Sequence, residues 1–362
     1  MALKSKFIGI DNVRGLVAIW VMLGHYLLIG HFIQKTDLNL NSVLQYFDPV
    51  ALFFIISGFL IPMSLKKHGP KIFLKKRFYR IMPVLFTVSS FHFIFVHQNF
   101  STFINTLLLT FDITKNSPQV SVYWSLVIEV YFYLILSLSY HLCNKKITPS
   151  IFLAIAASFS LYLLSDLYNN HYYMSVFSRY TSLLIFIFIG SIIYTLEETK
   201  NIKNFTLNIS LLLILLYFSI NYCHKTATDL LFQQKFSDEY PEGVFIISET
   251  NEHRLSIKTY FLSKISMIIL FFITLRYFNI NSKILTFLSK ISYPIYLSHL
   301  TIYIALQKSF TFQSHIKLGY IASLVTILVS YIIHRYIEKP GIKGSALPST
   351  LTIQNINNKV HH

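Results

Sequence analysis

The stretch NVRGLVAIWVMLGHYLLIGHFI, residues 12–33, decides the fold because it is apolar over the length that a membrane-spanning helix requires. Two ionisable residues interrupt it, Arg14 near its beginning and His25 eleven residues farther along. Eleven residues return to the same face of a helix within roughly 20° and advance roughly 16 Å along its axis. The stretch therefore predicts a transmembrane helix with a cation near the membrane surface and an imidazole deeper in the apolar layer, on one face.

His25 by itself has two interpretations. A charged residue at the centre of a bilayer costs about 2.5–3.5 kcal/mol on insertion scales, so ionisable residues in membrane helices are read as functional by default. A neutral imidazole avoids much of this cost, and a histidine that only packs two helices together is equally consistent with the residue alone.

The composition extends the membrane interpretation to the whole chain. Of the 362 residues, 54% are hydrophobic and only 13% are charged, which excludes an ordinary soluble domain. Apolar runs of about 20 residues predict about ten spans. We place them at 12–33, 46–64, 81–97, 122–142, 150–165, 179–196, 206–222, 260–275, 291–307 and 318–334. The run 101–111 is too short to span and predicts an interfacial or re-entrant piece.

The predicted fold class is an all-α integral membrane protein. Residues 1–343 form one polytopic domain and residues 344–362 a polar tail, with no separate soluble domain and no cleavable signal. About twenty Lys and Arg fall in one set of connections and about eight in the other, which predicts that both termini are cytoplasmic. The net charge of +16 then reflects a cytoplasmic rim that faces anionic lipid, and no nucleic-acid partner is required.

Residues 65–80 form a strongly basic connection without any acid. Arg77 and Arg80 are three residues apart, so on a helix they share a face and are suited to gripping phosphate groups. Lys76 is a further candidate for the same role. The remaining lysines are explained by membrane orientation and by contact with lipid headgroups.

A second ionisable residue lies inside an apolar span. Ser125 and Glu129 are four residues apart and share a helical face, and Trp124 before them is expected at the outer interface. Counted from that interface, Glu129 reaches roughly the depth of His25. We therefore expect the carboxylate to pair with the imidazole and raise its basicity. The alternative is a buried pair that only locks two helices together.

Besides Trp124, three further residues are predicted to support this site, each with a structural alternative. His299 lies near the middle of the ninth span, where it would line the cavity or simply bond a backbone carbonyl. Ser57, followed by a glycine between bulky residues, is also explained by close helix approach. Asp11 would cap the first helix or pair with Arg14.

Taken together, these stretches resemble the acyltransferase 3 family of integral membrane enzymes. The resemblance covers about residues 5–343. It rests on IDNVRG at 10–15 leading to His25, FFIISGFL at 53–60, RFYR at 77–80, WSL at 124–126 with Glu129, ISY at 291–293 leading to His299, and IEKP at 337–340. Members of the family move acyl groups, usually acetyl, from coenzyme A to hydroxyls of glycans and other acceptors.

The resemblance implies roles for particular residues. The family's histidine that matches His25 and the arginine that matches Arg14 are regarded as essential for function. The arginine pair that matches Arg77 and Arg80 is associated with handling of acyl-CoA. The expected donor is therefore cytoplasmic acyl-CoA, most simply acetyl-CoA, held as a co-substrate by these cations and by Lys76.

The expected catalytic residues are His25, Glu129 and Ser125. His25, oriented by Glu129, would take the proton of the acceptor hydroxyl, a step usually worth about 10²–10⁴ in rate. Ser125 or a tyrosine hydroxyl would donate to the developing oxyanion. A two-step route through acyl-His25 stays open. No cluster with the spacing of metal ligands occurs in the sequence, so no metal is expected.

Two alternatives come from other classes of protein. A proton-coupled transporter or flippase of a glycan precursor would use the same His25 and Glu129, and a non-catalytic scaffold of glycan assembly is also conceivable. Against the transporter, the sequence shows no matched halves with broken helices. The expected acceptor is a sugar hydroxyl on an envelope or lipid-linked glycan. The composition, rich in Lys, Asn and Ile, suggests an AT-rich bacterial genome, and the expected location is the bacterial cytoplasmic membrane.

Overall fold

The computed structural model describes residues 2–34, 49–96, 99–111, 114, 118–167, 172–199, 257–277, 282–310 and 315–344. All regular structure in these ranges is helical, and no strand occurs in them. The helices are α1 (Ala2–Gln34), α3 (Pro49–His68), α4 (Pro70–Val96), α5 (Phe100–Leu108), η1 (Ser121–Tyr123), α6 (Trp124–Leu142), α7 (Ile147–Leu167), α8 (Tyr172–Thr199), α10 (Ile257–Tyr277), α11 (Lys283–Ser309), α12 (His315–Ile333), η2 (His334–Glu338) and α13 (Lys339–Gly344).

Every predicted span except 206–222 overlaps one of these helices, although α4 begins already at Pro70, within the basic connection. That span, the residues after it up to 256 and the tail from residue 345 lie outside the described residues. In the described part, 4 segments are long and apolar enough to cross a membrane: Pro49–His68, Pro70–Val96, Trp124–Leu142 and Lys317–Ile342. The all-helical class is thus confirmed for the described residues. The total number of spans and the side on which the termini lie stay predictions.

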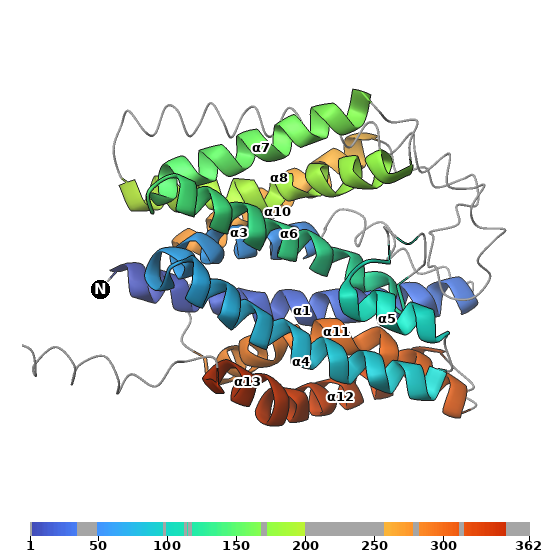
Figure 1. Cartoon of the computed structure of the whole chain (residues 1–362). Helices are drawn as coiled ribbons and strands as arrows, with labels where there is room; N and C mark the ends of the chain where they lie inside the picture. The colour runs from blue at the N-terminus through green and yellow to red at the C-terminus, as the bar shows by residue number, and fades with distance from the viewer. Residues whose placement is uncertain are drawn as a thin grey trace, which may run out of the picture.

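The helices run lengthwise in one bundle (Figure 1). In this bundle α1 packs against α11, α12 and α3, and α3 in turn packs against α8. The start of α1, the start of α4 and the short α13 lie at the same end of the bundle (Figure 1). The nine-residue α5 is too short to span, as predicted for the run 101–111.

Close packing of α3 and α8 explains the Ser-Gly pair of the FFIISGFL stretch. A Cβ atom at Gly58 would lie 1.8 Å from the carbonyl oxygen of Ile187, and one at Gly190 would lie 2.0 Å from that of Ile55. The hydroxyl of Ser191 donates to the carbonyl of Gly58 at 3.0 Å. Glycine at both positions therefore lets the two backbones touch, as small residues do between membrane helices.

Substitution of either glycine tests this crossing. Gly58→Ala and Gly190→Ala are each expected to lower stability by about 1–3 kcal/mol or more, because backbone atoms must separate to admit the methyl group. Thermal unfolding of the detergent-purified protein measures the loss. Gly24→Ala is the matched control, since a Cβ there meets nothing within 4 Å. A control that loses as much stability as Gly58→Ala would contradict the explanation.

Helices α1 and α11 are close neighbours and run in the same direction. At Gly15 a Cβ atom would lie 2.5 Å from the backbone nitrogen of Ser289, so this glycine sets the approach of the two helices. Arg14 then meets Ser289, and His25 meets His299 farther along the same two helices. The prediction that Arg14 and His25 share one helical face is confirmed, because both face α11.

Candidate functional site

Polar side chains gather at two levels along α1, one around Arg14 and one around His25. Arg14 lies at the level nearer the start of the helix. Its Nη1 pairs with Asp11 at 3.3 Å, and its Nη2 lies 3.4 Å from the carbonyl oxygen and 3.5 Å from the hydroxyl of Ser289. Its Nε is buried without a hydrogen-bond partner. The sequence left open whether Asp11 caps the helix or pairs with Arg14, and the structure shows the pair.

Arg80 reaches the same level from α4. Its Nε pairs with Oε1 of Glu338 at 3.2 Å, and Oε2 of that carboxylate lies 2.7 Å from Nδ1 of His334. His334 and Glu338 are the ends of a π-helical turn, in which the N–H of Lys339 donates to the carbonyl of His334. Such turns within α-helices often mark functional sites. Glu338 is only 1% exposed, so these two partners offset the cost of burying its carboxylate.

Glu129 and Arg77 complete this level of the site. Glu129 accepts a hydrogen bond from the hydroxyl of Tyr133 and interacts electrostatically with Arg80. The guanidinium of Arg77 lies 5.2 Å from the ring centre of Tyr133 and 5.2 Å from that of Phe73. Arg77 and Arg80 thus both border Tyr133, which fits their predicted position on one face of α4.

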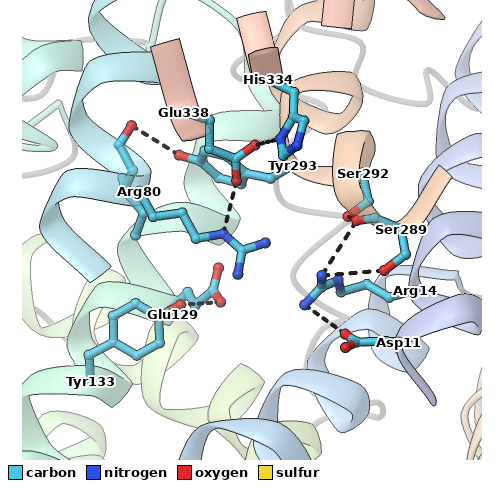
Figure 2. A network of polar contacts seen from close by, with 11 residues as sticks. Asp11, Arg14, Arg80, Glu129, Tyr133, Ser289, Ser292, Tyr293, His334 and Glu338 are labelled. Carbon is cyan, nitrogen blue, oxygen red and sulfur yellow. Dashed lines mark hydrogen bonds and ion pairs between the residues drawn. The ribbon is translucent and has the colours of Figure 1, made fainter. Parts of the chain in front are cut away.

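We refer to Arg14, Arg77 and Arg80, with the carboxylates Asp11, Glu129 and Glu338, as the arginine cluster. Figure 2 shows the guanidinium groups of Arg80 and Arg14 pointing toward one another from α4 and α1. The terminal nitrogens of Arg80 have no hydrogen-bond partner among the described residues. The cluster therefore contains guanidinium N–H groups that no described residue accepts from, and such groups are well suited to a phosphate-bearing ligand.

His25 and His299 form the second polar level, farther along α1. Nδ1 of His25 lies 2.9 Å from the carbonyl oxygen of Val21 and 3.2 Å from Nε2 of His299. The two ring centres are 5.1 Å apart. His299 is fully buried, whereas His25 is half-buried. Nε2 of His25 has no protein hydrogen-bond partner in the described part of the chain.

Ser125 lies between the two levels. Its hydroxyl is 2.7 Å from that of Tyr296 and 3.0 Å from the carbonyl oxygen of Val122, which is 3.2 Å from the Tyr296 hydroxyl. Tyr296 in turn is 6.0 Å, ring to ring, from His299. Both hydroxyl protons are used within this triangle. Ser125 would have to break one of these bonds before it could donate to an oxyanion, and its catalytic role stays a prediction.

The predicted pairing of Glu129 with His25 is wrong. Ser125, at the start of α6, lies level with Tyr296, so Glu129 falls one helical turn farther on, in electrostatic contact with Tyr293. The six residues from Tyr293 to His299 on α11 correspond to roughly 9 Å. The depth count failed because it did not fix the offset of α6 along α11: Ser125, at the start of α6, lies beside Tyr296, and Trp124 packs edge-on against Phe54.

Two other predicted residues, Lys76 and Ser57, lie outside the network of hydrogen bonds and ion pairs described above. Lys76 is on α4 beside Arg77 and makes no hydrogen bond or ion pair with any described residue. Ser57 is buried next to the crossing of α3 and α8, which agrees with its structural alternative. Neither contacts His25.

The partners of Arg80 and Glu129 were not predicted from the sequence. Glu338 was noted only as part of the IEKP stretch, and His334 was not among the predicted site residues. A signal was present: Glu338 is the only acid in residues 315–344 and stands four residues after a histidine. Tyr133 likewise stands four residues after Glu129.

The fold and site define a helical membrane protein in which the pair of His25 and His299 lies farther along α1 than the arginine cluster. The family model of the acyltransferase 3 group, described as an acyltransferase domain, matches residues 7–335. The chain therefore belongs to this family of membrane acyltransferases. No curated protein and no solved structure matches it.

Proposed function

We propose that the protein transfers an acyl group, most simply acetyl, from cytoplasmic acyl-CoA to a hydroxyl of an envelope or lipid-linked glycan. The observation that carries this proposal is the placement of Arg14 and His25 on one face of α1, with the arginine cluster at one level and the histidine pair at the other. The levels are separated by roughly 16 Å along the helix. A long, thin pantetheine arm suits this separation.

The arginine cluster is the proposed binding site for the donor. Coenzyme A carries several phosphates, and the terminal nitrogens of Arg80, the guanidinium of Arg77 and the buried Nε of Arg14 supply donors that the protein leaves unused or stacked on rings. Lys76 would add a further cation at the edge of this cluster. Glu338 and Asp11 hold the side chains of Arg80 and Arg14 in place before the donor arrives.

His25 is the proposed general base. Its unpartnered Nε2 would accept the proton of the acceptor hydroxyl while the oxygen attacks the thioester carbonyl. The new C–O bond forms, the C–S bond breaks, and the proton on Nε2 passes to the departing thiolate, which restores neutral His25. Donation to the oxyanion by Ser125 requires rearrangement of its contact with Tyr296.

The remaining parts of the proposal follow from charge and composition. Both termini would face the cytoplasm of a bacterial cell, since Lys and Arg concentrate in the connections at that side. Acyl-CoA would then reach the arginine cluster from inside. The glycan would approach the histidine pair from the opposite side of the bilayer.

Binding of acetyl-CoA tests the donor site. Acetyl-CoA at 100 times its dissociation constant is expected to stabilise the purified protein by about 2.7 kcal/mol. The double variant Arg77→Ala, Arg80→Ala should lose this stabilisation. Lys71→Ala, Lys75→Ala is the matched control, because it removes the same charge from exposed positions of the same helix.

Two results would contradict the donor site. One is an equal loss of stabilisation in both double variants, which would mean that only overall charge matters. The other is no stabilisation of the wild-type protein at any concentration of acetyl-CoA. In that case, proton-dependent uptake of a glycan precursor by membranes that contain the protein would favour the transporter.

A further inference from the structure

The contacts of the two histidine rings fix the position of their protons. Nδ1 of His299 lies 3.1 Å from the carbonyl oxygen of Ile295, and Nδ1 of His25 lies 2.9 Å from that of Val21. A carbonyl oxygen only accepts hydrogen bonds, so each Nδ1 must carry a hydrogen to make its bond. The third contact joins Nδ1 of His25 to Nε2 of His299 at 3.2 Å.

One assignment with neutral rings satisfies all three contacts. A neutral imidazole has one N–H, so Nε2 of His299 is an acceptor once its Nδ1 is the donor. The Nδ1 hydrogen of His25 is then shared between Val21 and His299, and the lone pair of His25 lies on Nε2. The opposite arrangement, with Nε2 of His299 as the donor, would break the bond from His25 to Val21. It would also either break the bond from His299 to Ile295 or require a charged His299 at a site with 0% exposure.

We propose that His299 is a positioning residue that holds His25 in the tautomer with hydrogen on Nδ1 and the basic lone pair on Nε2. This inference rests on the proposed function and replaces the role first expected of Glu129. The bond partner of one ring nitrogen decides which form of a histidine is present, and carboxylates or carbonyls usually fill that place. Here a second imidazole does so beside a carbonyl.

The same contacts serve the charged state of the base. When the acceptor hydroxyl gives its proton to Nε2, His25 becomes an imidazolium whose Nδ1–H still donates to two acceptors, Val21 and His299. A hydrogen bond from a charged donor is roughly twice as strong as one between neutral groups. His299 thus supports the cation that forms during the reaction without placing a permanent negative charge in the apolar layer.

The surrounding helices hold His299 in this position. The hydroxyl of Tyr26, next to His25 on α1, donates to the carbonyl oxygen of His299 at 2.7 Å. The same hydroxyl lies 3.0 Å from the hydroxyl of Thr326 on α12. Contacts from α1 and α12 therefore hold the backbone of α11 at His299, whose ring is oriented by its own bonds to Ile295 and His25.

Two substitutions separate positioning from packing. His299→Leu fills the space but removes the acceptor, and it is expected to lower kcat for acyl transfer about 10- to 100-fold, with less than about a twofold change in KM for acyl-CoA. His299→Gln places an amide oxygen near the site of Nε2 and should retain kcat within about threefold of the wild type. Equal kcat values for the wild type and the leucine variant would overturn the proposal.

A spectroscopic measurement tests the tautomer directly. In protein labelled with ¹⁵N-histidine, the His25 signals, identified by their absence in His25→Gln, should show a protonated Nδ1 and an unprotonated Nε2. The leucine variant should show a larger fraction of the Nε2-protonated tautomer than the wild type, because only Val21 still holds the Nδ1 hydrogen, and the glutamine variant should show the wild-type form. A wild-type His25 with hydrogen on Nε2 would overturn the proposal, whether or not the leucine variant folds.

These outcomes are separable from failure of the proposed function. If His25→Ala retained transfer, the general base would be wrong, whereas the ¹⁵N spectrum would still report the tautomer. If His25→Ala abolished transfer and the spectrum of His299→Leu equalled that of the wild type, only the role of His299 would fall.

Discussion

Replacement of His25 by alanine is expected to reduce acyl transfer by about 10²–10⁴-fold, because the step loses its proton acceptor. The variant should still bind acetyl-CoA, since the arginine cluster lies roughly 16 Å away along α1 and makes no contact with the imidazole. Release of free coenzyme A from acetyl-CoA by membranes that contain the protein and its acceptor measures the rate. The loss should appear in kcat and not in the KM for acetyl-CoA.

An exposed histidine supplies the control for this experiment. His141 lies at the end of α6 and its side chain is exposed, so His141→Ala removes an imidazole without touching either polar level. Its rate should equal that of the wild type within about twofold, as for surface substitutions in general. A His25→Ala variant that keeps more than a tenth of the wild-type rate at equal protein amount would refute the assignment of the base.

Removal of the Glu338 carboxylate is expected to have the largest effect on stability. Glu338→Ala leaves the Nε of Arg80 without its partner in a buried setting, and breaking such a pair costs about 3–5 kcal/mol. Glu338→Gln should cost less, because its amide oxygen still accepts a hydrogen bond from Arg80. Thermal unfolding in detergent measures both losses.

The pair of Lys66 and Glu198 provides a matched control for burial. It joins α3 to α8, but its two side chains are 51% and 28% exposed, whereas that of Glu338 is 2% exposed. Glu198→Ala is therefore expected to cost about 0–1 kcal/mol. Equal losses from Glu198→Ala and Glu338→Ala would show that the pair with Arg80 is not the buried link described above.

Much of the fold was predictable because its signals are local in sequence. Long apolar runs located the helices, and the helical repeat placed Arg14 and His25 on one face. The small residues around Gly58 correctly indicated close approach of two helices, although not that the partner would be the segment around Gly190.

The pairing between helices was not predictable in the same way. The depth of Glu129 depended on where α6 begins relative to α11, and no periodicity in the sequence fixes that offset. The contact of Arg80 with Glu338 joins helices far apart in the chain and depends on a π-helical turn. His299 was identified as a candidate, but its ring partner follows from how α1 and α11 pack at Gly15.

Inside-out membrane vesicles supplied with isotopically labelled acetyl-CoA give the most direct test of the central claim, that a donor held at the arginine cluster reacts beside His25. Mass spectrometry of the extracted envelope glycans should find the labelled ester with the wild-type protein and only background with His25→Ala. The claim is contradicted if the alanine variant incorporates as much label. It is equally contradicted if wild-type vesicles incorporate none although the glycans of intact cells carry the ester.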